Sequence, residues 1–530
     1  MLLITRHALL SLLLLGLGCT PAPRGAVEQS APDAGSKPNI VLIYLDDLGY
    51  GDVSAYGQTT LPTPNIDALA TGGIRFTNGY AASATCTPSR YALLTGRYPW
   101  RNKQAKILPG TAPLIIDTNQ LTLPGALRPA GYFTGVVGKW HLGLGSGQVN
   151  WNDSISPGPN EVGFDYSYIM AATQDRVPTV YLRDGLVQGL DPADPIEVSY
   201  RENFPGEPTG ATNPEMLDLR WHHGHNNSIV NGIPRIGYMR GGAEAKWSDV
   251  DMNDHFLAEA QRFIEQHADE PFFLYYAMQQ PHVPRTPHPR FVGSSGLGPR
   301  GDVIVEADWS IGQLVATLER KGLLENTLII LSSDNGPVLN DGYYDEAVER
   351  LGDHRPAGPL RGGKYSLYEA GTRVPFITYW KGTITPRVSD ALVSQLDVLP
   401  SLLELTGQGG AADLPTPASR PPLDGEPLLA TLLGQTERGR EELILEATSR
   451  TALRRGDWLM IPPYSGTRLL GEVQIETGSA PEYQLYNLQD DLGQQRNLAE
   501  ERPEVLAEMQ AAFLAIRGKD YGGGAPLKLE

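Results

Sequence analysis

The chain has 530 residues, of which 41% are hydrophobic and 20% are charged, and its formal net charge at pH 7 is −18. This length exceeds the roughly 100–200 residues of one simple domain, and the composition is that of a soluble globular protein. The negative charge argues against a nucleic-acid partner and against a broadly basic membrane-binding surface.

Residues 1–19 have the pattern of a secretory signal peptide. Arg6 is followed by an apolar run that ends at Gly18 and Cys19 and is too short for a comfortable membrane span. The end of this run is similar to a bacterial lipobox, although two positions differ from the usual pattern, and a plain signal peptide is the alternative interpretation. Residues 20–37 are rich in Pro, Ala, Gly and Ser and predict a flexible tether. We therefore expect an exported bacterial protein, in the periplasm or on the cell surface, that touches a membrane only through an N-terminal lipid.

Four short apolar runs, each ending in polar residues, predict strands that are buried on both faces. They are Asn39–Asp47, Tyr132–His141, Pro271–His282 and Thr327–Gly336. Helical patterns precede these runs or lie between them, at residues 63–71, 88–96, 120–131, 254–267 and 306–322. Strands that alternate with amphipathic helices indicate an α/β fold whose large, mostly parallel sheet is sandwiched by helices.

The remaining chain predicts an insertion, a linker and a second, smaller unit. Residues 184–250 have few periodic apolar positions and are interpreted as a long insertion over one face. The main domain is expected over residues 38–407 and a linker over 408–427. Two predicted strands and a final helical pattern then indicate a C-terminal α+β subdomain over 428–530 with a short antiparallel sheet. The strands are expected at residues 452–461 and 482–491 and the helix at 502–518.

Polar residues follow each of the four predicted strands. In an open parallel sheet, ligands bind beyond the carboxyl ends of the strands, so these side chains are expected to share one crevice if the strands are neighbours. They are Asp46, Asp47, Lys139, His141, His282, Asp334 and Asn335. Three carboxylates and an amide oxygen suit calcium, or magnesium less well, because calcium accepts looser coordination. Taken singly, each residue also has a structural interpretation as a helix cap, a turn or a loop residue.

Cys86 lies at the start of a predicted helix. Pro88 suits the first turn of that helix, which continues to Gly96, and Arg90 is near enough to reach back toward position 86. If Cys19 carries lipid or is removed, Cys86 has no disulfide partner. A helix N-terminus favours an anion, whereas the alternative interpretation is a small cysteine packed at a helix start.

The stretch CTPSR followed by LLTGR resembles the signature of the type I sulfatases. Further blocks similar to that family follow in the family's order from about Lys37 onward, and they are DDLGYGD, GKWHLG, QPHVP, SDNG and GGKYSLYEAGTRVP. The resemblance implies an alkaline phosphatase-like fold and a sulfuric ester hydrolase. It also implies that a formylglycine-generating enzyme, which recognises Pro88 and Arg90, oxidises Cys86 to Cα-formylglycine.

The resemblance also implies the functional residues. The implied calcium ligands are Asp46, Asp47, Asp334, Asn335 and the modified Cys86.

The other implied roles belong to positively charged or titratable residues. Arg90 would hold the formylglycine hydrate, and Lys139 and Lys364 would bind the sulfate oxygens. His141 would assist breakdown of the covalent intermediate, and His282 would contact the sulfate and help the alcohol to leave.

The chain resembles bacterial arylsulfatase A-like and N-acetylgalactosamine-6-sulfatase-like members, which implies a sulfated small molecule or glycan as substrate. Candidate sugar contacts, with scattered loop polarity as the alternative interpretation of each, are His222, His223, His225, His288, Arg290, His354 and Arg361. Two competing functions remain open on the sequence: a phosphonate or phosphate monoesterase of the same superfamily, and a calcium-dependent surface binding protein with a degenerate site.

Overall fold

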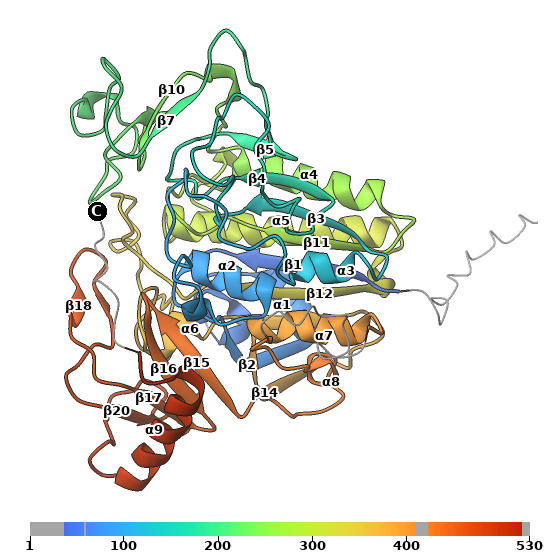
Figure 1. Cartoon of the computed structure of the whole chain (residues 1–530), viewed down its shortest axis with the longest axis vertical. Coiled ribbons are helices and arrows are strands. Elements are labelled where there is room, and N and C mark those ends of the chain that lie inside the picture. The colour runs from blue at the N-terminus through green and yellow to red at the C-terminus, as the bar shows by residue number, and fades with distance from the viewer. Residues whose placement is uncertain (1–36, 58–59, 409–421, 522–530) are drawn as a thin grey trace, which may run out of the picture. The chain divides into compact units, whose positions relative to one another are not determined.

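A computed structural model of the protein describes residues 37–57, 60–408 and 422–521. Its centre is a ten-stranded sheet (Figure 1). In spatial order the strands are β14 (Arg387–Ser394), β2 (Ile74–Tyr80), β13 (Phe376–Tyr379), β12 (Thr327–Ser333), β1 (Asn39–Leu45), β11 (Phe272–Ala277), β3 (Phe133–Lys139), β4 (Tyr166–Met170), β5 (Tyr181–Arg183) and β6 (Leu186–Val187). The expected signal peptide, Cys19 and the tether up to residue 36 lie outside the described residues, as do 409–421 of the expected linker.

Five adjacent strands, β12, β1, β11, β3 and β4, run parallel to one another. The flanking strands make the sheet mixed, because β13 and β5 pair antiparallel with their neighbours. The observed architecture therefore confirms the expected fold class, a large and mostly parallel sheet with helices on both faces.

Helices cover both faces of the sheet because successive side chains of the central strands point to opposite sides. Ile40, Leu42 and Tyr44 of β1 belong to one apolar core, and Val41 and Ile43 to the other. The first core includes side chains from α2 (Cys86–Thr95), α3 (Leu123–Leu127), α7 (Val398–Leu405) and α8 (Leu429–Leu432). The second includes side chains from α1 (Pro64–Gly72), α4 (Met252–Gln266), α5 (Pro299–Arg320) and α6 (Glu369–Thr372).

Some elements differ from the sequence expectation. Helix α5 begins seven residues before the expected start at Glu306. Pro299 suits its first position, because a backbone N–H there would have no partner within the helix. The expected helix at 120–131 is only α3, which ends before Pro129. Strand β14, a short 3-10 turn and helix α7 then follow one another over residues 387–405.

The C-terminal part contains the expected antiparallel sheet with a helix against it (Figure 1). Its strands are β15 (Glu442–Ala447), β16 (Arg450–Arg455), β17 (Trp458–Ile461) and β20 (Gln484–Asn487), and the helix is α9 (Pro503–Arg517). The run 452–461, expected as one strand, is a hairpin because Gly456 adopts a left-handed conformation (φ 51°) between β16 and β17. The expected domain limits at 407 and 428 stay predictions.

The remaining strands are short pairs in loops. The region 184–250 contributes β7 (Glu197–Ser199) with β10 (Tyr238–Arg240), and β8 (Ile229–Val230) with β9 (Ile233–Pro234). A further pair, β18 (Leu469–Leu470) with β19 (Ile475–Glu476), lies in the C-terminal part. Within the described ranges, we find no helix with the length and apolar character needed to span a membrane.

Candidate active site

The carboxyl ends of β12, β1, β11 and β3 lie side by side, which brings together the polar residues that follow them. The register pairs Leu45 of β1 with Ser333 of β12, so Asp46 and Asp334 are the next residues along adjacent strands. The Asp334 backbone N–H donates to Leu45 O at 3.0 Å, and the Asp47 N–H donates to Asp334 Oδ1 at 3.2 Å. Strand register therefore fixes the positions of these carboxylates.

Asp46, Asp47 and Asp334 form a buried acidic cluster, with one ligand oxygen of each lying within 4.8 Å of the others. Asn335 joins it, because its Nδ2 donates to Asp47 Oδ1 at 2.7 Å. Burial, followed by the charge of Asp334, raises the pKa of Asp46 well above its usual range. Asp46 Oδ1 and Asn335 Oδ1 are buried without a hydrogen-bond donor. Closely spaced carboxylate and amide oxygens, some without a hydrogen-bond donor, form an environment that favours a divalent cation.

Arg90 and Lys139 place positive charge next to the acidic cluster. Arg90 is fully buried, and its Nε and Nη2 lie 3.0 and 2.8 Å from Asp334 Oδ2. Its Nη1 donates to Lys139 O at 3.2 Å, and Lys139 Nζ pairs with Asp46. Gly138 places Lys139 there, since its φ is 116° and a Cβ would approach Ala277 O to 1.9 Å. Arg90 thus contacts a cluster carboxylate in this structure, whereas the sequence resemblance assigned it to the residue at position 86.

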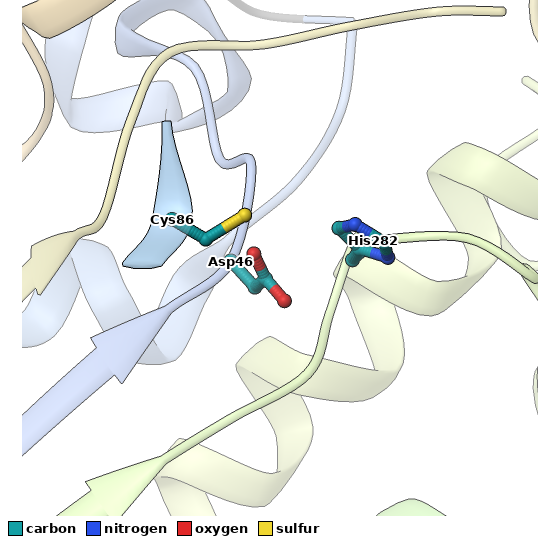
Figure 2. Close-up of side chains that lie close together, drawn as sticks. All are labelled: Asp46, Cys86 and His282. Carbon is teal, nitrogen blue, oxygen red and sulfur yellow. The ribbon is translucent and has the colours of Figure 1, made fainter. Parts of the chain in front are cut away.

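Cys86 is the first residue of α2, rather than lying just ahead of that helix as expected. Figure 2 shows its sulfur on the side that faces Asp46 and His282, and one ligand atom of each residue lies within 4.8 Å of the others. Burial raises the pKa of the Cys86 thiol to about 12. An unmodified thiol here stays protonated at neutral pH and is a poor nucleophile.

Two histidines border the pocket around Cys86. Burial, followed by the charge of Lys139, lowers the pKa of His141 well below its usual range, and burial followed by Lys364 does the same for His282. His141 Nε2 contacts Leu108 O at 3.0 Å, and its buried Nδ1 has no partner. Both rings are therefore neutral at pH 7 and can accept a proton.

Lys364 lies between two carboxylates. Its Nζ donates to Asp47 Oδ2 at 2.9 Å and to Asp341 Oδ2 at 2.8 Å. Burial alone would lower the pKa of Lys364, but these two carboxylates raise it well above its usual value. Lys364 therefore remains charged at the edge of the acidic cluster.

The Cys86 pocket, defined here as the cavity of about 290 Å³ lined by Cys86, His141, His282 and Lys364, has a polar outer wall. This wall includes Asp175, Arg176, Tyr200, His223, His225 and Asp341.

Asp175 organises the outer wall of the Cys86 pocket. It accepts hydrogen bonds from His225 Nε2 at 2.8 Å and from Arg176 Nη1 at 3.0 Å. Sequence reasoning missed Asp175 and Arg176 as site residues. Strand β4 is a fifth parallel strand and ends at Met170. Because ligands bind beyond the carboxyl ends of parallel strands, both residues would have been candidates if β4 had been predicted from the sequence.

The structure places only three of the seven candidate sugar contacts in the lining of a pocket. His223 and His225 line the Cys86 pocket, and His222 lines a neighbouring one. The others are outside the Cys86 lining and have different partners, as follows: His354 is buried against Asp52, Arg361 pairs with Glu476, Arg290 pairs with Asp254, and His288 lies near Asp251.

The fold and site define a hydrolase with an alkaline phosphatase-like sheet and a buried, oxygen-rich cluster beside a cationic pocket. Residues 38–408 match the family model described as Sulfatase. The chain belongs to the sulfatase family and is an arylsulfatase-like sulfuric ester hydrolase.

Individual relatives agree with this assignment. The chain is 47% identical over 507 residues to an N-acetylgalactosamine-6-O-sulfatase of Bacteroides thetaiotaomicron, covering 95% of this chain and 98% of that protein. It is 35% identical to human arylsulfatase A over 77% of this chain and 70% of that protein. A solved B. thetaiotaomicron structure, described in connection with the metabolism of multiple glycosaminoglycans, superimposes with a TM-score of 0.88 at 48% identity over 91% of this chain and 99% of the other.

Proposed function

We propose that this sulfatase removes the 6-sulfate of N-acetylgalactosamine residues in sulfated glycans. The observation that carries the proposal is the 47% identity, over nearly the full length of both chains, to a protein with that described activity. The polar outer wall of the Cys86 pocket supports it, because Asp175, Arg176 and His225 present donors and acceptors suited to sugar hydroxyls beside the reacting sulfate.

We assign a divalent cation, calcium, to Asp46, Asp47, Asp334 and Asn335. The fit rests on hard oxygen donors and on the two buried oxygens that lack hydrogen bonds. Calcium bound there supplies positive charge that stabilises a sulfate group. Arg90 holds Asp334 in place through two contacts, so it is a positioning residue for this set.

We also propose that residue 86 acts as formylglycine, a modification typical of the family, after a formylglycine-generating enzyme oxidises Cys86. One hydroxyl of the hydrated aldehyde attacks the sulfur, and the S–O bond to the alcohol breaks. Deprotonation of the second hydroxyl then drives cleavage of the C–O bond, which expels sulfate and regenerates the aldehyde. The raised pKa of the buried Cys86 thiol supports this proposal, because a protonated thiol is a poor nucleophile.

The surrounding side chains complete the proposed reaction. Lys139 and Lys364 are buried ammonium groups that bind sulfate oxygens. His141 takes a proton at its free Nδ1, since that atom is buried and unpartnered. His282, whose Nε2 is 3.9 Å from Asp47 Oδ2, contacts the oxygen of the leaving alcohol.

Export and lipid attachment through residues 1–19 belong to the same proposal. The basic start at Arg6, the apolar run and Cys19 support it from the sequence. Labelling cells with a radioactive fatty acid tests it: wild-type protein is expected to be labelled, and Cys19→Ala protein is not.

A panel of substrates tests the catalytic proposal. Protein whose residue 86 has been verified as aldehyde is assayed with N-acetylgalactosamine 6-sulfate, its 4-sulfate isomer, p-nitrophenyl sulfate and p-nitrophenyl phosphate. We expect the 6-sulfate to be the best sugar substrate and the aryl sulfate to be hydrolysed faster than the aryl phosphate. Preference for the 4-sulfate would refute the sugar position, and faster phosphate hydrolysis would contradict the proposed chemistry.

A further inference from the structure

Asp341 is a buried carboxylate of the Cys86 pocket that has no role in the reaction proposed above. It lies in the loop after β12, belongs to the outer wall of the pocket and is 6% exposed. Burying a carboxylate costs free energy, and a negative charge beside the position of a sulfate group repels that group. A carboxylate in this place is therefore unfavourable for stability and for substrate binding unless it has a further role.

Both oxygens of Asp341 accept hydrogen bonds from consecutive residues. Lys364 Nζ donates to Oδ2 at 2.8 Å, and the hydroxyl of Tyr365 donates to Oδ1 at 3.3 Å. Burial alone would raise the pKa of Asp341, but the charge of Lys364 holds that pKa below its usual range. Asp341 is therefore ionised at neutral pH and forms a buried ion pair with Lys364, an ammonium group that the proposed reaction uses.

The backbone of Lys364 and Tyr365 is held by hydrogen bonds to two other loops. The N–H of Lys364 donates to Pro337 O at 2.9 Å, and the N–H of Tyr365 donates to Ala84 O at 2.8 Å. The flexible four-carbon stem of a lysine nonetheless separates its ammonium group from the backbone. The Lys364 ammonium therefore needs an acceptor of its own to keep one position in the pocket.

Asp47 is a poor candidate for the sole acceptor of Lys364. Its Oδ2 accepts from Lys364 Nζ at 2.9 Å, but Asp47 is also one of the proposed cation ligands. A carboxylate that shares its charge with a cation attracts an ammonium group less strongly. Asp341 is not among the proposed ligands and keeps its full charge for Lys364. One of its oxygens also lies within 4.8 Å of ligand atoms of Asp47 and His282, so it holds the ammonium close to the reacting groups.

We propose that Asp341 is a positioning residue that fixes the Lys364 ammonium for the transition state, at the expense of sulfate affinity. The inference rests on the proposed function, because it assumes that Lys364 binds a sulfate oxygen. A fixed ammonium group needs no reorganisation when charge shifts during the reaction, whereas a mobile one can still follow a bound sulfate. Loss of the Asp341 charge is therefore expected to reduce turnover without weakening substrate binding.

The substitution Asp341→Asn tests this inference, because it removes the charge and keeps the size of the side chain. The assay uses calcium-loaded enzyme whose residue 86 has been verified as aldehyde. We expect kcat for p-nitrophenyl sulfate to fall about 10–100-fold. KM and the inhibition constant of inorganic sulfate are expected to fall about threefold, since one negative charge beside the anion is removed. Calorimetric titration with sodium sulfate measures this affinity without turnover.

A double-mutant cycle shows whether Asp341 acts through Lys364. Lys364→Met is expected to lower kcat/KM by itself, because a contact to the sulfate is lost. Adding Asp341→Asn to Lys364→Met should change kcat by less than about twofold, since the group that Asp341 positions is absent. A further loss equal to that in the wild-type background would show that Asp341 acts independently of Lys364 and would overturn the inference.

Asp345→Asn is the matched control. Asp345 lies in the same loop, is 5% exposed and pairs with buried Arg285 at 2.8 Å, but it is outside the described lining of the Cys86 pocket. Loss of either ion pair should lower the thermal unfolding temperature, followed by circular dichroism, whereas kcat should fall only in Asp341→Asn. An equal fall in kcat in both variants would show that the loop is disturbed and would refute the positioning role.

The outcomes separate the inference from the proposed function. If kcat of Asp341→Asn stays above about half the wild-type value, or if sulfate binds more weakly, the inference is wrong while a loss in Lys364→Met still upholds the role of Lys364. If Lys364→Met keeps wild-type turnover, the proposed sulfate contact is wrong and the inference fails with it. Because p-nitrophenyl sulfate has no sugar, none of these results depends on the proposed sugar specificity.

Discussion

The inner half of the active site, which comprises the acidic cluster, Lys139 and the residue at position 86, lies at the ends of adjacent parallel strands. Its outer half, the outer wall of the Cys86 pocket, is built from loops that are distant in sequence. Asp46, Lys139 and Asp334 are fixed by the register of β1, β3 and β12. Asp175 and His225 instead meet across 50 residues through a single contact at 2.8 Å. A rigid inner half suits chemistry that tolerates little displacement, and a loop-built outer half suits substrate recognition, so variants of the two should behave differently.

The largest expected effect is at residue 86 in the inner half. Cys86→Ala removes the proposed nucleophile, so we expect turnover of both aryl sulfate and sugar sulfate to fall at least about 10⁴-fold. Thermal unfolding followed by circular dichroism should stay close to wild type, because the side chain removed is small. Near-normal turnover by this variant would contradict the mechanism, and Cys86→Ser is the conservative comparison.

The acidic cluster of the inner half gives the next largest effect. Dialysis against EDTA, or the substitution Asn335→Ala, is expected to lower kcat on every sulfate ester by about 10²–10³-fold, since fixed positive charge next to the sulfate is lost. Added calcium should restore the dialysed enzyme better than magnesium. Asn326→Ala, at the opposite end of β12, is the matched control. Full activity after verified metal removal would refute the cation assignment.

The loop after β1 leads out of the inner half, and its contribution to the free energy of unfolding provides the next test. Asp52 is buried, and Arg300 Nη1 donates to its Oδ1 at 2.8 Å while His354 Nε2 contacts the same oxygen at 2.8 Å. Burial alone would raise the pKa of Asp52, but Arg300 and His354 lower it to about 2. Because the folded-state pKa is below the unfolded value, the stabilisation is complete above about pH 4 and is lost as pH falls toward 2; it amounts to about 2–3 kcal/mol.

Asp52→Asn is accordingly expected to reduce the free energy of unfolding at pH 7 by about 3 kcal/mol, because Arg300 stays buried without its counter-charge. Urea denaturation at several pH values measures this loss, which should diminish on acidification. Glu197→Gln, in an exposed pair with Arg240, is the control and should have little effect. If the free energy of unfolding of the Asp52 variant equals that of wild type at pH 7, the contacts of Asp52 with Arg300 and His354 do not stabilise the loop.

Much of the inner half could be predicted from the sequence, because a buried parallel strand appears as a continuous apolar run and its carboxyl end is marked by the first polar residues. Asp46 and Asp334 were found in this way. Lys364 was not, since it lies in a loop between β12 and α6, and only the family resemblance indicated it. Strands β2 and β13 were missed because their runs are short or contain polar residues.

The outer half was less predictable, because its residues meet through contacts that no local pattern records. Arg176 pairs with Ile236 in an isolated bridge, and Trp221 pairs with Tyr343. Histidines were candidates by residue type alone, and the fold placed His223 and His225 of the 184–250 region at the pocket but His354, from the loop after β12, on Asp52.

The smallest catalytic effect is expected in this outer half. His225→Ala should raise KM for N-acetylgalactosamine 6-sulfate about tenfold, since hydrogen bonds to the sugar and the support of Asp175 are lost. Turnover of p-nitrophenyl sulfate should change less than twofold, because that substrate has no sugar hydroxyls. His288→Ala, outside the pocket lining, is the control. An equal loss on both substrates would show that His225 serves the chemistry and would remove the distinction between the two halves.

The most direct test of the account is mass spectrometry of the tryptic peptide Phe76–Arg90, combined with turnover of p-nitrophenyl sulfate by the same calcium-loaded samples. Preparations made with and without a formylglycine-generating enzyme provide a series of aldehyde fractions at residue 86. We predict that kcat rises in proportion to the aldehyde fraction and is absent in protein that retains the thiol. Equal turnover by fully unmodified protein would contradict the account.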